Sequence, residues 1–129
     1  MSKPLLGLSE AAFHGLGRRT DFIIHVAAEV NMVKPPQALA ASNVGGTATV
    51  LHLAALAGAP VVFTSTMLPL GDTAPSGYRQ TKAAAEAVCE RHFDSHGVPS
   101  APLQLGDIGM ATAACSVVPP KELVRGRSC

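Results

Sequence analysis

Apolar residues gather along this chain in two kinds of pattern, short unbroken runs and longer stretches with helical spacing. Three runs have the length of a β-strand, the last weaker than the others: 21–28 (DFIIHVAA), 61–65 (VVFTS) and 101–105 (APLQL). Runs of this kind, without alternation of apolar and polar residues, are typical of strands covered on both faces. Three other stretches repeat their apolar residues every three or four positions and predict helices: 9–16, 37–57 and 78–96.

The expected ends of these helices carry recognisable residues. Ser9 can cap the first helix, because its hydroxyl can accept a hydrogen bond from a backbone N–H of the first turn. Gly58 and Gly97 follow the second and third helices, where a left-handed residue commonly ends a helix, and a proline lies shortly beyond each. Regular structure is expected to break at Pro35 and Pro36, since a proline pushes the preceding residue away from helical geometry.

The order of the elements predicts the fold. Strand, helix, strand, helix, strand is the pattern of a repeated crossover unit, in which the strands are parallel. We therefore expect an α/β domain over residues 1–110, with a Rossmann-like, doubly wound parallel sheet. Residues 111–129 lose all periodicity and are expected to form an irregular tail.

A nucleotide-binding sheet of this type has a glycine-rich turn directly after its first strand, because that turn holds the pyrophosphate at a helix N-terminus. Two glycine pairs are candidates. Gly15 and Gly17 follow a predicted helix, and Gly45 and Gly46 lie within one, so neither pair fits. The sequence is therefore interpreted as the back portion of such a domain, without its first βαβ half.

Composition and charge remove several classes of function. The 129 residues carry a net charge of +1 and only 4% aromatic residues, so neither nucleic acid nor an acidic membrane surface is an expected partner. The N-terminus has no apolar signal region, and no run approaches the length of a membrane span. Three cysteines at irregular spacing argue against a disulfide framework. We expect a cytoplasmic protein.

The segment GYRQTKAAAE contains the only tyrosine, Tyr78, followed by Lys82 on the same face of a predicted helix. A nearby ammonium favours the phenolate and lowers the pKa of the phenol, which makes the phenol a better general acid toward a carbonyl oxygen. Thr66 or Ser65, at the end of the second predicted strand, can hydrogen-bond the same oxygen. Taken singly, these residues favour ordinary structural roles over catalysis: a half-buried tyrosine at a helix start and a β-prone strand end.

Three further features have competing interpretations. His92 and His96 have the spacing of a metal-binding pair, but no second pair of ligands is near in sequence, so a solvated helix end is favoured and no metal site is predicted. His25 is interpreted as a packed strand residue. Gly45 and Gly46 within a helix favour either the close approach of a strand or cofactor, or a simple kink.

Together these segments resemble the extended short-chain dehydrogenase/reductases. The matching stretches run in family order over roughly residues 4–110: LLGLSEAAF, DFIIHVAAEVNMVKPPQALAASNVGGTATVLHLA, VVFTSTMLPLG, GYRQTKAAAE and LQLGDIG. The combination of HxAAxVN, NVxGT, a strand-ending ST and YxxxK is specific to this superfamily. The leading LGLS and the VN after the alanines favour the thioester-reductase-like branch, found in nonribosomal peptide and polyketide assembly lines and in carboxylic acid reductases.

The resemblance implies a role for each matching residue of the catalytic motif. Tyr78 is the implied proton donor. Lys82 would tune Tyr78 and hold the nicotinamide ribose. Thr66 would be the hydroxyl member of the catalytic group, with Ser65 as the alternative.

The resemblance also implies a cofactor, a reaction and a partner. The family prefers NADPH, and Ala27 and Ala28 would be the small residues that let the dinucleotide lie across the strand end. Asn43 matches the helix asparagine near the cofactor. The implied reaction delivers a hydride to an acyl thioester, held on the phosphopantetheine of an acyl or peptidyl carrier domain. It releases an aldehyde, which some members reduce again to an alcohol.

Two alternatives remain open. The same catalytic residues occur in other extended short-chain dehydrogenases, such as sugar-nucleotide epimerases and ketoreductases. A non-catalytic gene fragment is the other alternative, and its exposed sheet edge would invite self-association. Three departures from the family lead us to expect weak activity or none of this chain in isolation. The phosphate-binding turn is missing, Gln104 stands where the branch often has arginine, and the family's C-terminal substrate region is missing beyond Gly109.

Overall fold

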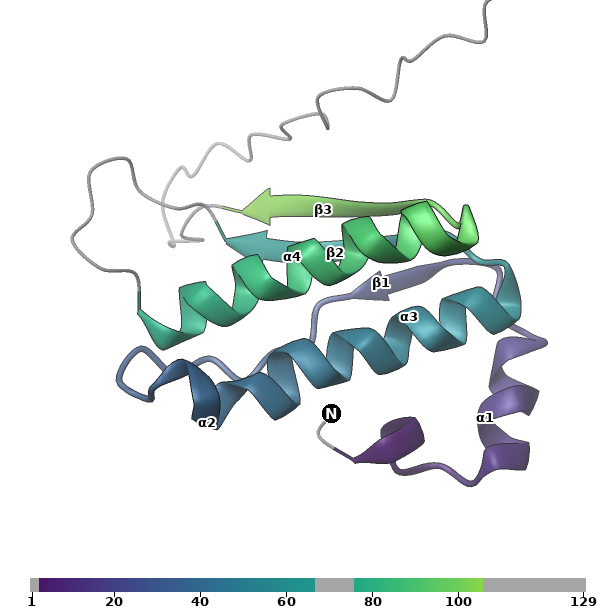
Figure 1. Cartoon of the computed structure of the whole chain (residues 1–129). Helices are drawn as coiled ribbons and strands as arrows, with labels where there is room; N and C mark the ends of the chain where they lie inside the picture. Colours follow the sequence, from purple (N-terminus) through teal and green to yellow (C-terminus); the bar gives the residue numbers. More distant parts are fainter. Residues whose placement is uncertain (1–2, 67–75, 106–129) are drawn as a thin grey trace, which may run out of the picture.

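The computed structural model describes residues 3–66 and 76–105, which form a three-stranded parallel sheet with helices packed against it (Figure 1). The predicted tail at 111–129 and the loop that follows the second strand lie outside the described residues, apart from the end of that loop. In chain order the elements are η1 (Pro4–Gly7), α1 (Glu10–Gly17), β1 (Ile23–His25), α2 (Pro36–Ala40), the π-helical turn η2 (Ala41–Gly45), α3 (Gly46–Ala57), β2 (Val61–Thr66), α4 (Gly77–His96) and β3 (Ser100–Leu105).

The strands are parallel and lie in the order β1-β2-β3, as the alternation of elements predicts. Ile23 pairs with Val61 at the start of β1, and Thr66 pairs with Leu105 at the end of β2. β1 is only three residues long, whereas the apolar run predicts a strand over 21–28. Residues 26–28 leave the sheet at its carboxyl end, where a nucleotide-binding sheet places its ligand.

The predicted helix ends are confirmed. The Ser9 hydroxyl accepts a hydrogen bond from the Ala12 N–H at 3.3 Å. Gly58 and Gly97 have left-handed backbones, with φ of 65° and 66°, and end α3 and α4. Pro35 is extended, as expected from the proline that follows it, but Pro36 begins α2 instead of only interrupting regular structure.

The helical stretch Pro36–Ala57 runs through α2, η2 and α3 and is apolar enough to cross a membrane by length and composition alone, with a mean hydropathy of 1.3. In the fold it is a core helix, because its Leu51 and Ala54 face β2 across the sheet–helix interface. Gly45 ends the π-helical turn, so the glycine pair marks an irregularity within a continuous helix. The packing against the sheet accounts for the apolar composition.

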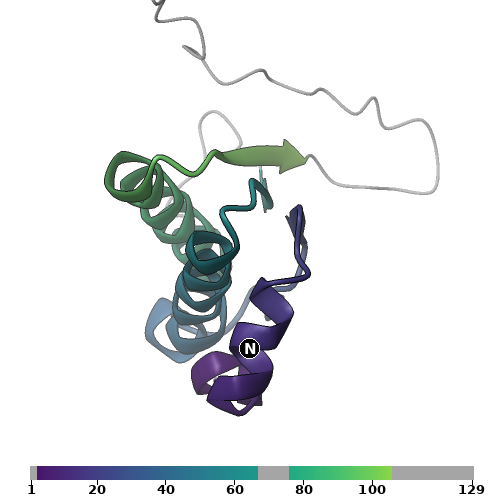
Figure 2. The same ribbon diagram turned by 90° about the vertical axis from the view of Figure 1, so that its right-hand side faces the viewer.

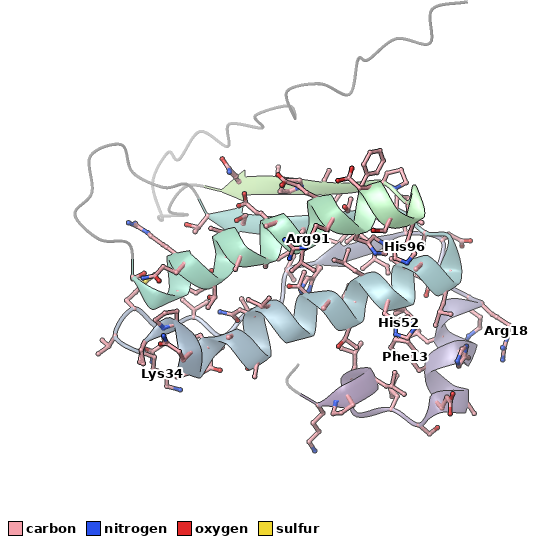
Figure 3. All side chains as sticks on the ribbon, viewed as in Figure 1. Phe13, Arg18, Lys34, His52, Arg91 and His96 are labelled. Carbon is pink, nitrogen blue, oxygen red and sulfur yellow. The ribbon has the colours of Figure 1, made fainter. Side chains whose placement is uncertain are left out.

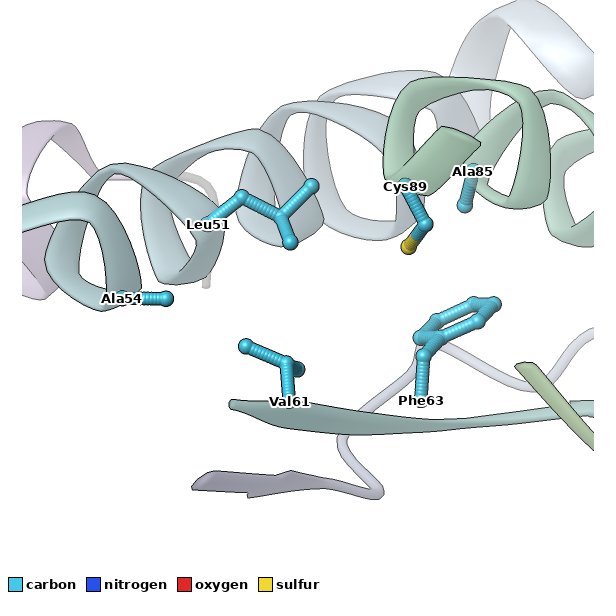
Figure 4. Packing of buried hydrophobic residues seen from close by; sticks show 6 residues of the cluster. All are labelled: Leu51, Ala54, Val61, Phe63, Ala85 and Cys89. Atoms are coloured by element: carbon cyan, nitrogen blue, oxygen red, sulfur yellow. The ribbon is translucent and has the colours of Figure 1, made fainter. Parts of the chain in front are cut away.

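The core lies between the sheet and helices α3 and α4 (Figure 4). Its buried cluster takes two residues from each of α3, β2 and α4: Leu51, Ala54, Val61, Phe63, Ala85 and Cys89. Burial of this apolar surface is the main force that holds the helices on the sheet. Cys89 is a free thiol within this cluster, and burial is the first cause that raises its pKa to about 11.

Helix α1 packs against helix α3. Its Phe13 is fully buried, and the Phe13 ring lies 5.5 Å from the His52 ring of α3 (Figure 3). The end of α1 lies close to Leu53 and Leu56, since a Cβ at Gly17 would be in ordinary van der Waals contact with both at 3.6 Å. These contacts fix α1 to α3.

The helices cover one face of the sheet only (Figure 2). On the other face, alternate residues along β1 and its flanks are exposed although they are apolar: Phe22 is 51% exposed, Ile24 65% and Val26 65%. Within residues 3–66 and 76–105, nothing covers this face. A doubly wound sheet has helices on both faces, so the described fold is one side of such an architecture.

Candidate active site

The candidate site lies at the carboxyl end of the sheet, where helix α4 begins (Figure 1). Ser76 caps α4 through its hydroxyl, which accepts a hydrogen bond from the Arg79 N–H at 3.4 Å. The cap places Tyr78 in the first turn of α4 and Lys82 one turn later, above the end of β2.

Gly77 lets the start of α4 lie directly on the backbone that leads into α2. A Cβ at this position would lie 2.3 Å from the Lys34 carbonyl oxygen, 2.7 Å from the Pro36 nitrogen and 2.8 Å from the Pro35 carbonyl carbon. All three atoms belong to the backbone and cannot turn aside. The approach therefore requires glycine, and it fixes the first turn of α4 in place.

Lys82 is buried, with only 3% of its surface exposed. Its ammonium donates a hydrogen bond to the Thr64 carbonyl oxygen and lies 4.1 Å from the centre of the Phe63 ring. Burial lowers the pKa of Lys82, while the charges of Glu86 and Cys89 act in the opposite direction. The amine is thus held at the peptide group that joins Thr64 to Ser65 in the sheet.

Tyr78 does not have the lowered pKa that its spacing from Lys82 predicts. Burial raises the pKa of the Tyr78 phenol, and this expectation is therefore wrong for the structure described. The reason is the direction of the lysine side chain, which reaches down to Thr64 and Phe63 instead of along the helix surface. The phenol is protonated at neutral pH, and its raised pKa makes it a weaker acid than the spacing from Lys82 predicts.

The two hydroxyl candidates lie on opposite faces of β2. Ser65 follows Val61 and Phe63 on the face covered by helices, and its hydroxyl is buried without a hydrogen-bond partner in the described residues. Thr66 is half-buried on the other face, at the last position of the strand. A buried hydroxyl without a partner is uncommon in folded proteins, so the end of β2 offers an unused hydrogen-bonding group.

Asn43 connects the segment after β1 to helix α4. Its Oδ1 accepts a hydrogen bond from the Glu29 N–H at 2.7 Å, and its Nδ2 donates to the Glu29 carbonyl at 3.1 Å and to the Thr81 hydroxyl at 3.0 Å. Both amide hydrogens of Asn43 are therefore used within the protein. Ala28 is half-buried and Ala27 exposed, directly before the segment that Asn43 holds.

His25 is buried in the strand, as predicted, and belongs to a hydrogen-bonded chain. The Thr47 hydroxyl donates to the Asn43 carbonyl at 2.7 Å, and His25 Nε2 lies 3.0 Å from the same hydroxyl oxygen. Because the hydroxyl has one proton, which points to Asn43, Nε2 must carry the proton of the neutral ring. Burial, followed by the charge of Lys82, lowers the pKa of His25 to about 4.

The chain is expected to lose stability as the pH falls from 6.5, the ordinary pKa of histidine, to about 4. In this window the unfolded chain binds a proton at His25 that the folded chain excludes, so acid favours unfolding by up to about 3 kcal/mol. Urea unfolding across this range, with His25→Gln as the comparison, measures the effect. The glutamine can still donate to Thr47 but does not titrate.

His92 also has a lowered pKa, through burial and the charge of His96, so only the difference between the wild type and His25→Gln isolates His25. A variant whose stability falls with acid as steeply as that of the wild type would contradict the role of His25.

Several residues of the site were not predicted from the sequence. Thr81 and Thr47 carry the hydrogen-bonded chain, and Gly77 sets the position of α4. The sequence signal for these residues is weak, since a threonine inside a helix and a glycine at the start of one are common.

The expectation of a solvated histidine pair at the end of α4 is wrong for His92. Its side chain is 8% exposed, and its ring is stacked on that of His96 at 4.5 Å. In residues 3–66 and 76–105 no group of three metal-ligating side chains comes together.

Comparison with known proteins places this geometry in a family. Residues 1–73, more than half of the chain, match the family of NAD-binding domains described as "Male sterility protein". The chain is 40% identical over 105 residues to the glycine betaine reductase ATRR of Emericella nidulans. The match covers 67% of this chain and 8% of that protein. It is 33% identical over 125 residues to the isonitrile lipopeptide synthase of Streptomyces coeruleorubidus. This match covers 84% of this chain and 8% of the synthase.

Solved structures agree with the fold. The terminal R domain from the myxalamid PKS-NRPS biosynthetic pathway superposes with a TM-score of 0.72 at 36% identity, over 81% of this chain and 31% of that one. The UDP-glucuronic acid 4-epimerase of Bacillus cereus gives a TM-score of 0.66 at 19% identity, over 82% of this chain and 38% of the epimerase, and shows the fold alone.

The chain thus spans under a tenth of these curated relatives and about a third of the R domain. The motifs and the family match agree on one assignment. The chain belongs to the "Male sterility protein" family of NAD-binding domains, within the thioester-reductase-like branch of the extended short-chain dehydrogenase/reductases.

Proposed function

We propose that this chain is the catalytic part of an NADPH-dependent reductase that converts a carrier-bound acyl thioester to an aldehyde or alcohol. One observation supports this above the others: the buried Lys82 ammonium lies at the peptide bond leading into Ser65, whose buried hydroxyl has no partner in the described residues. Burying a charge and leaving a hydroxyl unpaired both oppose folding. Such groups are found together where a ligand completes the site.

The residues present fit a nicotinamide cofactor. Lys82 has the hydrogens to hold a ribose hydroxyl, and the unpaired Ser65 hydroxyl and Thr66 lie at the same strand end. Ala27 and Ala28 keep the strand end after β1 free of large side chains. When bound, the reduced cofactor would supply the hydride.

The chain's own residues would manage the proton. Tyr78 is neutral at pH 7, as an ordinary phenol is, and a neutral phenol can give its proton to the oxygen of a carbonyl that accepts a hydride at carbon. Thr66, or Ser65 in its place, would donate a hydrogen bond to the same oxygen as charge develops on it. Lys82, whose ammonium bonds the Thr64 carbonyl and not the phenol, would act here through the cofactor ribose.

The partner is proposed from the relatives. The isonitrile lipopeptide synthase and the PKS-NRPS pathway of the myxalamid R domain are named for assembly-line products, and ATRR is named as a glycine betaine reductase. A carrier domain with a phosphopantetheine-linked thioester is the corresponding substrate here.

The proposal can be tested in a chimera, in which a related reductase domain provides the parts of the fold that this chain lacks. A chimera in which residues 3–105 replace the equivalent segment of the myxalamid R domain would be given NADPH and an acyl thioester, both carrier-bound and free. We expect oxidation of NADPH with formation of aldehyde or alcohol, faster from the carrier-bound thioester. A chimera that folds and binds NADPH but reduces neither thioester would contradict the proposal.

Tyr78→Phe in this chimera is expected to lower the turnover number by at least about 100-fold, because a positioned general acid contributes this much or more. NADPH affinity should be unchanged, since the phenyl ring keeps the packing. Stopped-flow absorbance of NADPH measures turnover, and fluorescence titration measures its binding. If the phenylalanine variant reduces thioesters at the unaltered rate, Tyr78 is not the proton donor.

A further inference from the structure

Thr81 lies between Tyr78 and Lys82 on the inner side of α4 and is buried. Its hydroxyl donates a hydrogen bond to the Tyr78 carbonyl oxygen at 2.8 Å. Threonine often bonds a carbonyl of the preceding helical turn, so this contact alone is ordinary. The unusual feature is the second bond, in which the same oxygen accepts from Nδ2 of Asn43, 38 positions away in the chain.

Asn43 is itself fixed by the segment that follows β1. It bonds both backbone groups of Glu29, whose carboxylate is held by Lys34 at 2.7 Å and by the Ser42 hydroxyl at 3.1 Å. A continuous series of hydrogen bonds therefore runs from the Glu29 backbone through Asn43 and Thr81 to the Tyr78 carbonyl. Glu29 directly follows the two alanines at the end of β1.

We propose that Thr81 is a positioning residue, which fixes the Tyr78 phenol relative to the strand end after β1 through its hydrogen bonds to Asn43 and to the Tyr78 backbone. The role rests on the proposed function, because it assigns Tyr78 as the group to be positioned. The proton donor and the segment expected to face the cofactor lie on different elements. A small displacement between such groups can cost about 100-fold in rate. A direct side-chain connection holds their separation constant.

A purely structural threonine would act through its methyl group and its volume. A positioning threonine acts through its hydroxyl, because only the oxygen can bond both partners. Thr81→Val keeps the shape and removes both hydrogen bonds, while Thr81→Ser keeps the hydroxyl and removes the methyl group. The two variants therefore separate the two roles.

The environment of Tyr78 can be followed by the absorbance and fluorescence of the protein. It has one tyrosine and no tryptophan, so the ultraviolet absorbance and fluorescence of the protein report Tyr78 without background. In the full 129-residue chain, the phenol should ionise above its ordinary pKa of 10. In Thr81→Val the titration midpoint should fall toward 10, because the freed first turn exposes the phenol to water. Thr81→Ser should titrate like the wild type.

Acrylamide quenching of the fluorescence at neutral pH gives a second reading that does not depend on alkaline stability. The quenching constant should rise about twofold in Thr81→Val and stay constant in Thr81→Ser, while circular dichroism reports whether the fold is kept. Two results would overturn the proposal: a valine variant that is quenched and titrates like the wild type, or a serine variant that behaves like valine. Neither reading requires catalysis, so the outcome is separate from that of the thioester assay.

Discussion

Replacing Gly77 with alanine is expected to destabilise the folded chain by about 3 kcal/mol or more. The new methyl carbon would lie 2.3 Å from the Lys34 carbonyl oxygen and under 3 Å from two further backbone atoms. Because backbone cannot rotate out of the way, the first turn of α4 must lift from the segment that leads into α2. Urea unfolding followed by circular dichroism measures the change in the free energy of unfolding.

Gly45→Ala is the matched control. Gly45 also lies in helical backbone, but a Cβ there would meet only the Ala40 carbonyl oxygen, at an ordinary 3.9 Å. Alanine should leave stability unchanged or raise it by up to about 1 kcal/mol, since glycine is the poorer helix former. If Gly77→Ala were as well tolerated as Gly45→Ala, the close approach of α4 to Pro35 and Pro36 would be wrong.

The elements themselves follow closely from the sequence, because the features that set them are local. Ser9, Gly58 and Gly97 act on the helix ends beside them, and the apolar runs of β2 and β3 are long enough to be recognised. β1 is the exception. It ends at His25 although its apolar run continues, and residues 26–28 leave the sheet.

The sequence predicts which residues form the candidate site better than it predicts where their side chains reach. The spacing of Tyr78 and Lys82 places both on one helix face, but it does not show that the lysine reaches the Thr64 carbonyl instead of the phenol. That choice depends on Phe63, which lies under the ammonium and belongs to another element. Likewise, nothing near Thr81 in the sequence points to Asn43. Contacts between distant segments carry no local pattern, and this is why they were missed.

The open face of the sheet and the buried lysine have a common interpretation. Phe22, Ile24 and Val26 are apolar and exposed, whereas Lys82 is charged and buried. Both conditions oppose folding of the described residues by themselves, and both would be relieved by further structure or by a bound cofactor. Residues that lower stability in this way are common at functional sites, where selection retains them for activity.

Lys82→Met tests this interpretation through two opposite effects. In the chimeric reductase, turnover should fall by about 1,000-fold, because the variant loses the contact that would hold the cofactor ribose in place. In the chain itself, the free energy of unfolding should rise by about 1–3 kcal/mol, since methionine fills the same space beside Phe63 without a buried charge.

The matched control is the same substitution at an exposed lysine, and the sign of the stability change decides between two roles for Lys82. Lys34 makes an ion pair with Glu29 at 2.7 Å in an exposed position, so Lys34→Met should change stability by less than about 0.5 kcal/mol. If Lys82→Met destabilises the chain by more than about 1 kcal/mol, the hydrogen bond to Thr64 stabilises the fold, and ligand binding is not the role of this lysine. A more stable but inactive variant would instead identify Lys82 as a residue kept for chemistry at the expense of stability, which a lysine serving only the fold cannot produce.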